Sequence, residues 1–303
     1  IIVELTHVVR LVLISNDKIV YRPAGFPADQ TLYVYSLLDG ELLRELVGHT
    51  DTVTSIQMNE KVVVSGSEDR SVKVWDNHTA ICLHTLHGHT GKVTCLKIHK
   101  NIAVSGSWDN TMRLWYVREG TCLNILEGHQ DWGWSVQFNG RVVASGGDDG
   151  VIKIWDPVTA HCLLTLHGHS ALVTQIEIYG DLLVSASWWD CTVKVWDLNS
   201  GVCRYTISEV RYSYGRSIVL QDNIQVTGHL DKTAKIWDIL TGSLLLTLDG
   251  PQKHTPCITS IHVEGKFVIT ASVDGRIKLW NIKSGEFVRN LLEMEEGGIV
   301  QRM

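Results

Sequence analysis

A serine, a histidine and an aspartate recur together along this 303-residue chain at spacings that could do chemistry. In one such set, Ser65, His49 and Asp69 could act as nucleophile, general base and orienting acid, as in hydrolases that attack a carbonyl through an activated hydroxyl. The set returns four more times. The other copies are Ser105/His89/Asp109, Ser145/His129/Asp149, Ser185/His169/Asp190 and Thr270/His254/Asp274.

The repetition argues against catalysis, because an enzyme does not need five identical sets. A Trp also follows each hydroxyl by ten or eleven residues, and a buried indole and a buried imidazole each need a hydrogen-bond partner. We therefore expect a structural chain of hydrogen bonds from Trp to hydroxyl to His to Asp. The sequence predicts a protein that is not an enzyme.

The Trp spacing reveals the architecture. Trp75, Trp115, Trp155, Trp196, Trp237 and Trp280 are 40 to 43 residues apart. Within one repeat, residues 53–58, 61–67, 71–76 and 81–87 read as four short strands joined by polar turns. Repeats of this length stack because one unit cannot bury its apolar face alone. The sequence predicts an all-β β-propeller of four-stranded antiparallel blades, with seven recognisable repeats in a single domain over residues 1–303.

Composition and charge exclude several functions. The net charge of −6 is opposite to the basic field that nucleic-acid binding needs. No apolar stretch approaches the ~20 residues of a membrane span, and the first residues lack the features of a signal peptide. His99, His161 and His262 lack ligand spacing and there is no CxxC, so we expect no metal and no cofactor.

Seven cysteines are present, an odd number. Cys82, Cys122, Cys162 and Cys203 occupy the same slot in successive repeats, so we expect small apolar fillers rather than disulfides. Free thiols are typical of a reducing compartment, which predicts a cytoplasmic or nuclear protein, or both.

The repeated Gly-His, Ser/Thr, Asp and Trp-Asp pattern resembles WD-repeat propellers over about residues 6–293. Two repeats depart from it. The first has Tyr35 in place of Trp and an extended turn at 23–28, and the sixth has Arg211 in place of His. We expect both repeats to lose the hydrogen-bonded chain and to be the softer ones.

A narrower resemblance involves the end of the chain. Residues 246–260, 267–291 and 295–303 look like the late repeats of F-box/WD-repeat substrate receptors of SCF ubiquitin ligases. In the eight-bladed members a Gly-Gly-Ile-Val-like segment starts the eighth blade, and residues 297–300 form such a segment. Two alternatives therefore stay open, a ring of seven blades and a ring with a partial eighth blade. Residues 1–5 are expected to close the ring as an outer strand. A link to ligase subunits would use an F-box outside this chain.

That resemblance implies a phosphorylated ligand gripped by several arginines. Arg70 matches one such position, whereas Thr94 and Trp108 stand at two others, with Lys92 nearby. Whether the ligand carries a phosphate is therefore open.

Side chains around the channel mouth of the expected propeller are free to vary and form the candidate partner-binding surface. Exposed Trp and Arg often carry the binding energy of interfaces. The candidate residues are Arg10, Arg70, Lys92, Trp108, Trp132, Trp134, Asp148, Trp189, Tyr214, Arg216 and Lys232.

Three functions fit these residues. The first is a non-catalytic interaction module that recognises a short linear segment of a protein partner, as the substrate-recognition part of a ubiquitin ligase. The second is a scaffold that binds several partners through its sides. The third is a reader of methylated lysine, in which Trp108, Trp132 and Trp134 surround the ammonium beside Asp148 or Glu68.

Overall fold

The computed structural model describes residues 9–15, 18–23, 30–36, 39, 41–131, 133–187, 189–208, 218–221, 223–229, 231–249, 254, 258–272 and 276–293. These residues form seven four-stranded antiparallel sheets, each with its strands in chain order. Within these ranges there is no helix that could cross a membrane. The chain divides after His167 into two compact units.

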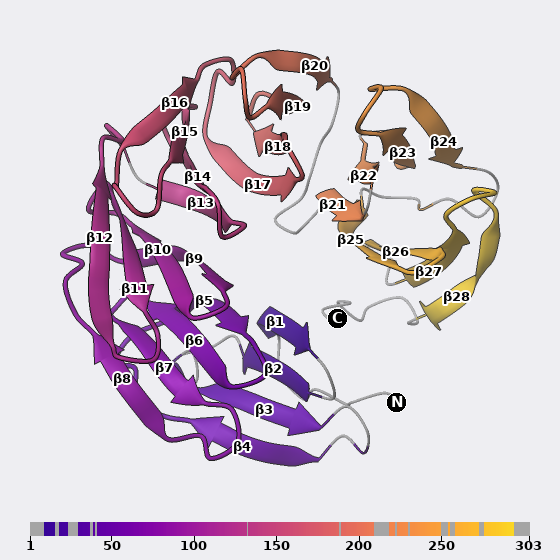
Figure 1. Ribbon diagram of the computed structural model, residues 1–303. Coiled ribbons are helices and arrows are strands. Elements are labelled where there is room, and N and C mark those ends of the chain that lie inside the picture. The colour runs from indigo at the N-terminus through magenta and orange to yellow at the C-terminus, as the bar shows by residue number, and fades with distance from the viewer. Residues whose placement is uncertain are drawn as a thin grey trace. The chain divides into compact units, whose positions relative to one another are not determined.

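The first unit contains four sheets (Figure 1). Sheet 1 comprises β1 (Val9–Ser15), β2 (Lys18–Pro23), β3 (Leu32–Ser36) and β4 (Leu42–Leu46). Sheet 2 comprises β5 (Val53–Met58), β6 (Val62–Ser67), β7 (Val72–Asp76) and β8 (Cys82–Leu86). Sheet 3 comprises β9 (Val93–His99), β10 (Ile102–Ser107), β11 (Thr111–Tyr116) and β12 (Thr121–Glu127). Sheet 4 comprises β13 (Gly133–Phe138), β14 (Val143–Gly147), β15 (Ile152–Trp155) and β16 (Cys162–Leu166).

The second unit contains three sheets. Sheet 5 comprises β17 (Val173–Tyr179), β18 (Leu182–Ser187), β19 (Thr192–Asp197) and β20 (Cys203–Ile207). Sheet 6 comprises β21 (Ile218–Gln221), β22 (Ile224–Gly228), β23 (Ala234–Asp238) and β24 (Leu244–Leu248). Sheet 7 comprises β25 (Ile258–Glu264), β26 (Phe267–Ser272), β27 (Arg276–Asn281) and β28 (Phe287–Glu293).

The strands follow from the residue patterns. The second strand of sheet 2, VVVSGS, is buried almost throughout, as expected where neighbouring sheets cover both faces. The third strand, VKVWD, alternates more. The strands predicted for this repeat coincide with β5 to β8 to within one residue at each end. The prediction of seven four-stranded repeats is confirmed.

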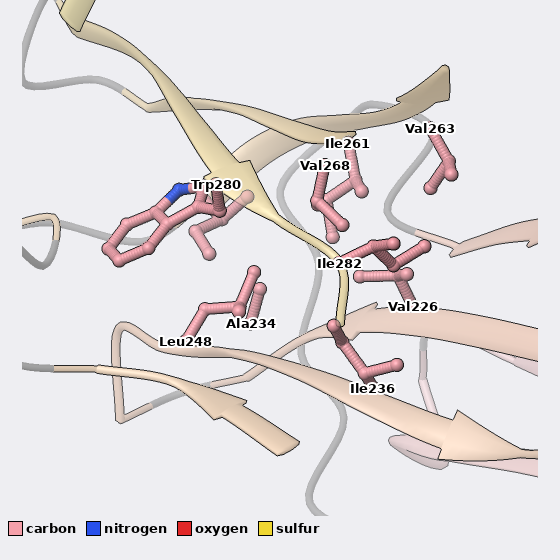
Figure 2. Close-up of a cluster of buried hydrophobic side chains, with 10 residues drawn as sticks. Val226, Ala234, Ile236, Leu248, Ile261, Val263, Val268, Trp280 and Ile282 are labelled. Carbon is pink, nitrogen blue, oxygen red and sulfur yellow. The ribbon is translucent and has the colours of Figure 1, made fainter. Parts of the chain in front are cut away.

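The hydrophobic cores lie between adjacent sheets of the same unit. One cluster joins Val226, Ala234 and Leu248 of sheet 6 to Val268 and Trp280 of sheet 7. Figure 2 shows the indole of Trp280 facing the side chains of sheet 6. A comparable cluster joins each pair of successive sheets within the first unit. Each sheet therefore buries its apolar faces against neighbours rather than within itself.

The Gly of each Gly-His pair is needed where the chain passes the indole. Gly128 has φ +145°, and a Cβ there would lie 3.3 Å from Trp155 Cη2. Both the positive φ and the close approach favour glycine.

Side chains of the fourth strand connect a sheet to the next sheet in the same unit. His84 Nε2 lies 3.0 Å from the carbonyl of Arg118, and Asn124 Nδ2 donates to the carbonyl of Pro157 at 2.8 Å. The ring of His84 lies so close to the turn that a Cβ on Gly120, which has φ +70°, would be 2.6 Å from its Nδ1. These bonds satisfy carbonyls at the turns between third and fourth strands.

The cysteine slot was predicted wrongly. Cys82, Cys122 and Cys162 are exposed, and Cys203 is partly exposed, so these residues are not buried fillers. The slot lies on the fourth strand, the outer edge of each sheet, where no further strand covers the side chain.

The predictions for the chain ends are not tested. Residues 1–5 and 297–300 lie outside the described residues, as does most of the extended turn at 23–28, so the closing strand and the partial eighth blade stay predictions. The single domain over residues 1–303 also stays a prediction. In sheet 1, Tyr35 is half-buried in the third strand, where five of the other repeats have a buried Trp and sheet 6 has the half-buried Trp237.

One core position holds a polar side chain in apolar surroundings. Gln225 is fully buried opposite Trp237, and neither atom of its amide has a hydrogen-bond partner among the described residues. The same slot in sheet 2 holds Val63, which is opposite Trp75. A buried unsatisfied amide costs about 1–3 kcal/mol.

We predict that Gln225→Val raises the free energy of unfolding by about 1 kcal/mol or more, because it removes two unsatisfied polar atoms. Chemical denaturation of the two proteins measures the change. The matched control is Val63→Gln, which places the same amide in the equivalent slot and should destabilise. Equal stability of Gln225→Val and the parent would show that the amide has a partner.

Candidate functional site

The Ser/Thr, His, Asp and Trp residues form a buried chain of hydrogen bonds, which we call the lock. In sheet 2, Trp75 Nε1 donates to Ser65 Oγ at 2.8 Å, and Ser65 Oγ lies 2.8 Å from His49 Nε2. His49 Nδ1 lies 2.7 Å from Asp69 Oδ2. Because the carboxylate of Asp69 can only accept, the proton of the neutral imidazole lies on Nδ1, and Nε2 accepts the proton of the Ser65 hydroxyl, which in turn accepts from the indole. Ser65 is fully buried, so its hydroxyl cannot meet a substrate.

The lock recurs with similar distances in other repeats. In sheet 3 the three bonds of Trp115, Ser105, His89 and Asp109 are 2.8, 2.8 and 2.7 Å. In sheet 5 those of Trp196, Ser185, His169 and Asp190 are 2.8, 2.7 and 2.8 Å. In sheet 7, Trp280 and His254 each lie 2.9 Å from Thr270 Oγ1, and Asp274 lies outside the described residues. The structural interpretation is confirmed in full for the sets of sheets 2, 3 and 5, and for sheet 7 as far as His254.

The sixth repeat keeps the hydroxyl–His contact by a different residue. Trp237 Nε1 donates to Thr227 Oγ1 at 2.7 Å, and His229 Nε2 lies 2.8 Å from the same oxygen. His229 is buried, although it stands two residues after the hydroxyl rather than sixteen before it. We expected this repeat to lose the chain of hydrogen bonds because Arg211 replaces the His. That expectation is wrong for the contact between the hydroxyl and a histidine. The signal was in the sequence, since sheets 2, 3, 4, 5 and 7 have Ser or Gly where His229 stands.

The fourth sheet has the loosest lock. His129 Nε2 lies 2.7 Å from Ser145 Oγ, but His129 Nδ1 and Asp149 Oδ2 are 3.7 Å apart, and Nδ1 has no hydrogen-bond partner among the described residues. In sheets 2, 3 and 5 a Ser or Thr two residues after the Asp donates to its carboxylate at 2.6 or 2.7 Å. Val151 stands there in sheet 4, and Gly147 replaces the Ser that precedes the turn.

The lock shifts the pKa values of its members. Burial opposes ionisation of the Asp69 carboxyl, but hydrogen bonds from His49 and Ser71 outweigh it and hold the pKa well below its usual range. The same balance lowers the pKa of Asp109 and Asp190. For His129 and His169 burial dominates and lowers the pKa, which favours the neutral imidazole.

In sheets 2 to 5, where both are described, two loops of each repeat meet at the same end of the sheet. We call the segment before the first strand the His loop (48–52, 88–92, 128–131 and 168–172). We call the segment between the second and third strands the Asp turn (67–71, 107–111, 147–151, 187–192 and 229–233). Backbone bonds join them, for example from Glu68 N to the carbonyl of Thr52 at 2.8 Å. Because the lock fixes both loops, the side chains between lock residues are presented outward.

Three side chains near the predicted partner-binding surface contact one another between sheets 2 and 3. Lys92 forms an ion pair with Glu68 and lies with Nζ 5.2 Å from the centre of the Trp108 ring. Trp108 is 36% exposed. Lys92 is therefore a neutralised cation stacked on an aromatic ring rather than a free phosphate ligand.

Arg70 and Lys232 lie in the position that follows the lock Asp. Both are exposed and have positive φ, 70° and 71° respectively. Gly150 fills this position in sheet 4 without strain, with φ +74°. A long side chain that is held at positive φ costs stability, and such strain concentrates at functional positions.

Trp189 and Asp148 lie just before a lock Asp. Trp189 is 71% exposed, in an Asp turn that is one residue longer than the others. Asp148 is exposed in the Asp turn of sheet 4. Tryptophan is enriched at protein–protein interfaces relative to the rest of the surface.

The remaining candidates are not placed. The side chains of Arg10, Trp132, Trp134, Tyr214 and Arg216 lie outside the described residues, so the predictions for them stay predictions. Across the residues that the structure describes, no three His, Cys, Asp or Glu side chains gather closely enough to hold a metal ion.

We predict that the protein loses stability steadily as the pH falls from 7 to 3. The imidazoles of His129 and His169 bind protons less readily in the fold than their ordinary pKa of about 6.5 implies, so their contribution is lost as the pH falls below 6.5. The lowered pKa of Asp69, Asp109 and Asp190 adds a second loss below about pH 4. Denaturant titrations across this range measure it. A free energy of unfolding that stays constant from pH 7 to 5 would contradict neutral buried imidazoles.

We predict that Gly147→Ser combined with Val151→Thr stabilises the protein by about 1 kcal/mol, because the hydroxyls steer Asp149 onto His129 Nδ1. A Cβ at Gly147 would lie 2.7 Å from Asp149 Oδ1 and 2.8 Å from His129 Nδ1, so the carboxylate must move and the imidazole must shift slightly. Thermal and chemical denaturation test this. The control is Ser71→Val, which copies the sheet 4 defect into sheet 2 and should destabilise. A destabilised double variant would show that Asp149 cannot move.

Comparison with known proteins identifies the repeat. The family described as "WD domain, G-beta repeat" matches residues 40–76, 80–116, 120–156, 160–197 and 242–281. The crystal structure of the computationally designed Ika8 protein is similar at a TM-score of 0.82 and 34% identity, over 94% of this chain and 86% of that one.

Matches to natural proteins are shorter. THO complex subunit 6 of Drosophila melanogaster is 39% identical over 74 residues, which is 24% of this chain and 20% of that protein. WD repeat-containing protein pop2 of Schizosaccharomyces pombe is 31% identical over 72 residues, 24% of this chain and 10% of that protein. Mitochondrial division protein 1 of Mycosarcoma maydis is 38% identical over 48 residues, 16% of this chain and 6% of that protein. The chain thus spans at most a fifth of these relatives. With its buried locks, its four-stranded sheets and a family match over most of its length, the chain belongs to the WD-repeat family of β-propeller proteins.

Proposed function

We propose that the chain is a non-catalytic protein-interaction module that recognises a short linear segment of its partner through the His loops and Asp turns. The observation that carries the proposal is the exposure of Trp108 and Trp189 in turns whose neighbouring lock residues are buried. Tryptophan is strongly enriched among the residues that dominate binding energy.

Backbone strain supports a role for the Asp turns of each unit. Arg70 and Lys232 occupy a position that favours glycine, at a cost of about 1 kcal/mol each. Stability alone would favour Gly there, as in Gly150. Long charged side chains at this position fit a role in binding.

We further propose that the partner is a ligase substrate, so that this chain serves as the substrate-recognition part of an SCF-type ubiquitin ligase. This rests on the resemblance of residues 246–260 and 267–291 to such receptors. A cytoplasmic or nuclear location is part of the proposal, supported by the exposed free thiols of Cys82, Cys122 and Cys162.

A reader of methylated lysine is the second candidate. The specific observation in its favour is the cation of Lys92 over the ring of Trp108, since the same ring face would accept a ligand ammonium. Lys92 would have to leave that face first.

We predict that a peptide array finds short ligands, and that Trp108→Ala or Trp189→Ala weakens the binding of one or more of them at least tenfold. Each ligand is presented unmodified, phosphorylated and methylated. A phosphate should add at most about 1–3 kcal/mol, because Arg70 is the one matching arginine and Lys92 is already paired.

The matched control is Leu163→Ala, an exposed apolar residue on the outer strand of sheet 4. It should leave affinity unchanged. The scaffold would be favoured if the array finds no ligand and if a protein that the parent chain captures is no longer captured by Leu163→Ala. A methyl preference lost in Trp108→Ala would favour the lysine reader.

A further inference from the structure

The His loops and Asp turns of sheets 2, 3 and 4 hold a concentration of negative charge. They contain seven carboxylates and two cations, so their net charge of −5 nearly equals the −6 of the whole chain. The carboxylates are those of Asp51, Glu68, Asp69, Asp109, Asp131, Asp148 and Asp149, and the cations are Arg70 and Lys92. A partner that docks on these turns meets a strongly negative surface.

The carboxylates converge in sheet 4. Asp148 and Asp131 are both exposed, from the Asp turn and the His loop respectively. Partial burial and then the charges of Asp131 and Asp149 raise the pKa of Asp148. Asp148 is thus close enough to Asp131 and to Asp149 to be repelled by each, and a cation beside Asp148 would relieve that repulsion.

A buried group independently marks this site. The side chain of His129 is 2% exposed, its Nδ1 has no hydrogen-bond partner among the described residues, and it points toward Asp149. The Asp149 carboxylate is 20% exposed, whereas the lock carboxylates of Asp69 and Asp109 are 8% and 7% exposed. In sheets 2 and 3 the carboxylate serves the lock, and in sheet 4 it is turned toward the outside.

The neighbouring sheet already displays the contact that a cation would make. Lys92 lies over the Trp108 ring and is balanced by Glu68. The Asp turn of sheet 3 contacts the His loop of sheet 4 through Asn110 Nδ2 and the carbonyl of Gln130 at 3.4 Å. An aromatic face and three carboxylates therefore lie on adjacent sheets of one unit.

We propose that the turns of sheets 2 to 4 bind a basic segment of a protein partner, with Arg or Lys side chains received by Asp131, Asp148 and Asp149. A second cation takes the face of Trp108 after displacing Lys92. This inference rests on the proposed function and adds the charge of the ligand. In the fourth repeat, Val151 and Gly147 weaken the lock, and the Asp149 carboxylate is then available to the partner.

The test measures fluorescence anisotropy of labelled (Gly-Ser-Arg)4, (Gly-Ser-Gln)4 and (Gly-Ser-Glu)4 peptides with the full chain at low and physiological salt. The arginine peptide should bind at least tenfold more tightly than the other two, and salt should weaken it. Asp131→Asn with Asp148→Asn should weaken it at least fivefold. The matched control, Glu60→Gln with Glu119→Gln, makes the same charge change at the opposite ends of the sheets and should have little effect.

Two further variants separate binding from folding. Lys92→Gln should strengthen the arginine peptide, because it frees Trp108 and removes a competing cation, whereas Lys232→Gln should change it less. Gly147→Ser with Val151→Thr should weaken the peptide while stabilising the fold, since it returns Asp149 to His129.

Equal binding of all three peptides, tighter binding of the glutamate peptide, or no effect of Asp131→Asn with Asp148→Asn would overturn the inference. If array ligands still depend on Trp108 in that case, the proposed function stands and the charge of the ligand is wrong. If they do not, both fail.

Discussion

The buried indole N–H of Trp75, Trp115, Trp155, Trp196 and Trp280 is the constraint on which the rest of the structure depends. Each of these rings lies in or beside the core of its sheet, and its Nε1–H must find an acceptor there. The hydroxyl of Ser65 accepts this hydrogen bond and is itself bonded to His49, which is bonded to Asp69. The equivalent hydroxyls of other repeats also accept the indole hydrogen bond. Sheets 2, 3 and 5 therefore join core packing to loop geometry in one chain of bonds.

This coupling explains how the protein separates stability from recognition. Because the lock pins the His loop and the Asp turn, the residues beside it can change without unfolding the sheet. Glu68, Trp108, Asp148 and Trp189 share the slot before the lock Asp, which therefore holds a carboxylate in two repeats and an indole in two others. The conserved part of the repeat carries the fold, and the variable part carries the charge and the aromatic rings.

The fold was predictable from the sequence because its signals repeat. The Trp spacing and the Gly-His pairs predicted the sheets, and the buried lock followed from hydrogen-bond needs. Residues that act outside the pattern were missed, since His229 reaches the hydroxyl from an unexpected position and Cys82 faces outward on an edge strand. The pairing of Lys92 with Glu68 joins two repeats across adjacent sheets, which periodicity within one repeat does not reveal. The described site thus depends on contacts between repeats.

Hydrogen exchange at the tryptophan indoles, followed by NMR, tests the central interaction most directly. The account predicts slow exchange for Trp75, Trp115, Trp155, Trp196 and Trp280, whose Nε1–H groups are buried and bonded to hydroxyls. It predicts fast exchange for the exposed Trp189, and faster exchange for the half-buried Trp237 than for the five. Exchange of the five at the rate of Trp189 would contradict the lock as the interaction that holds the repeats together.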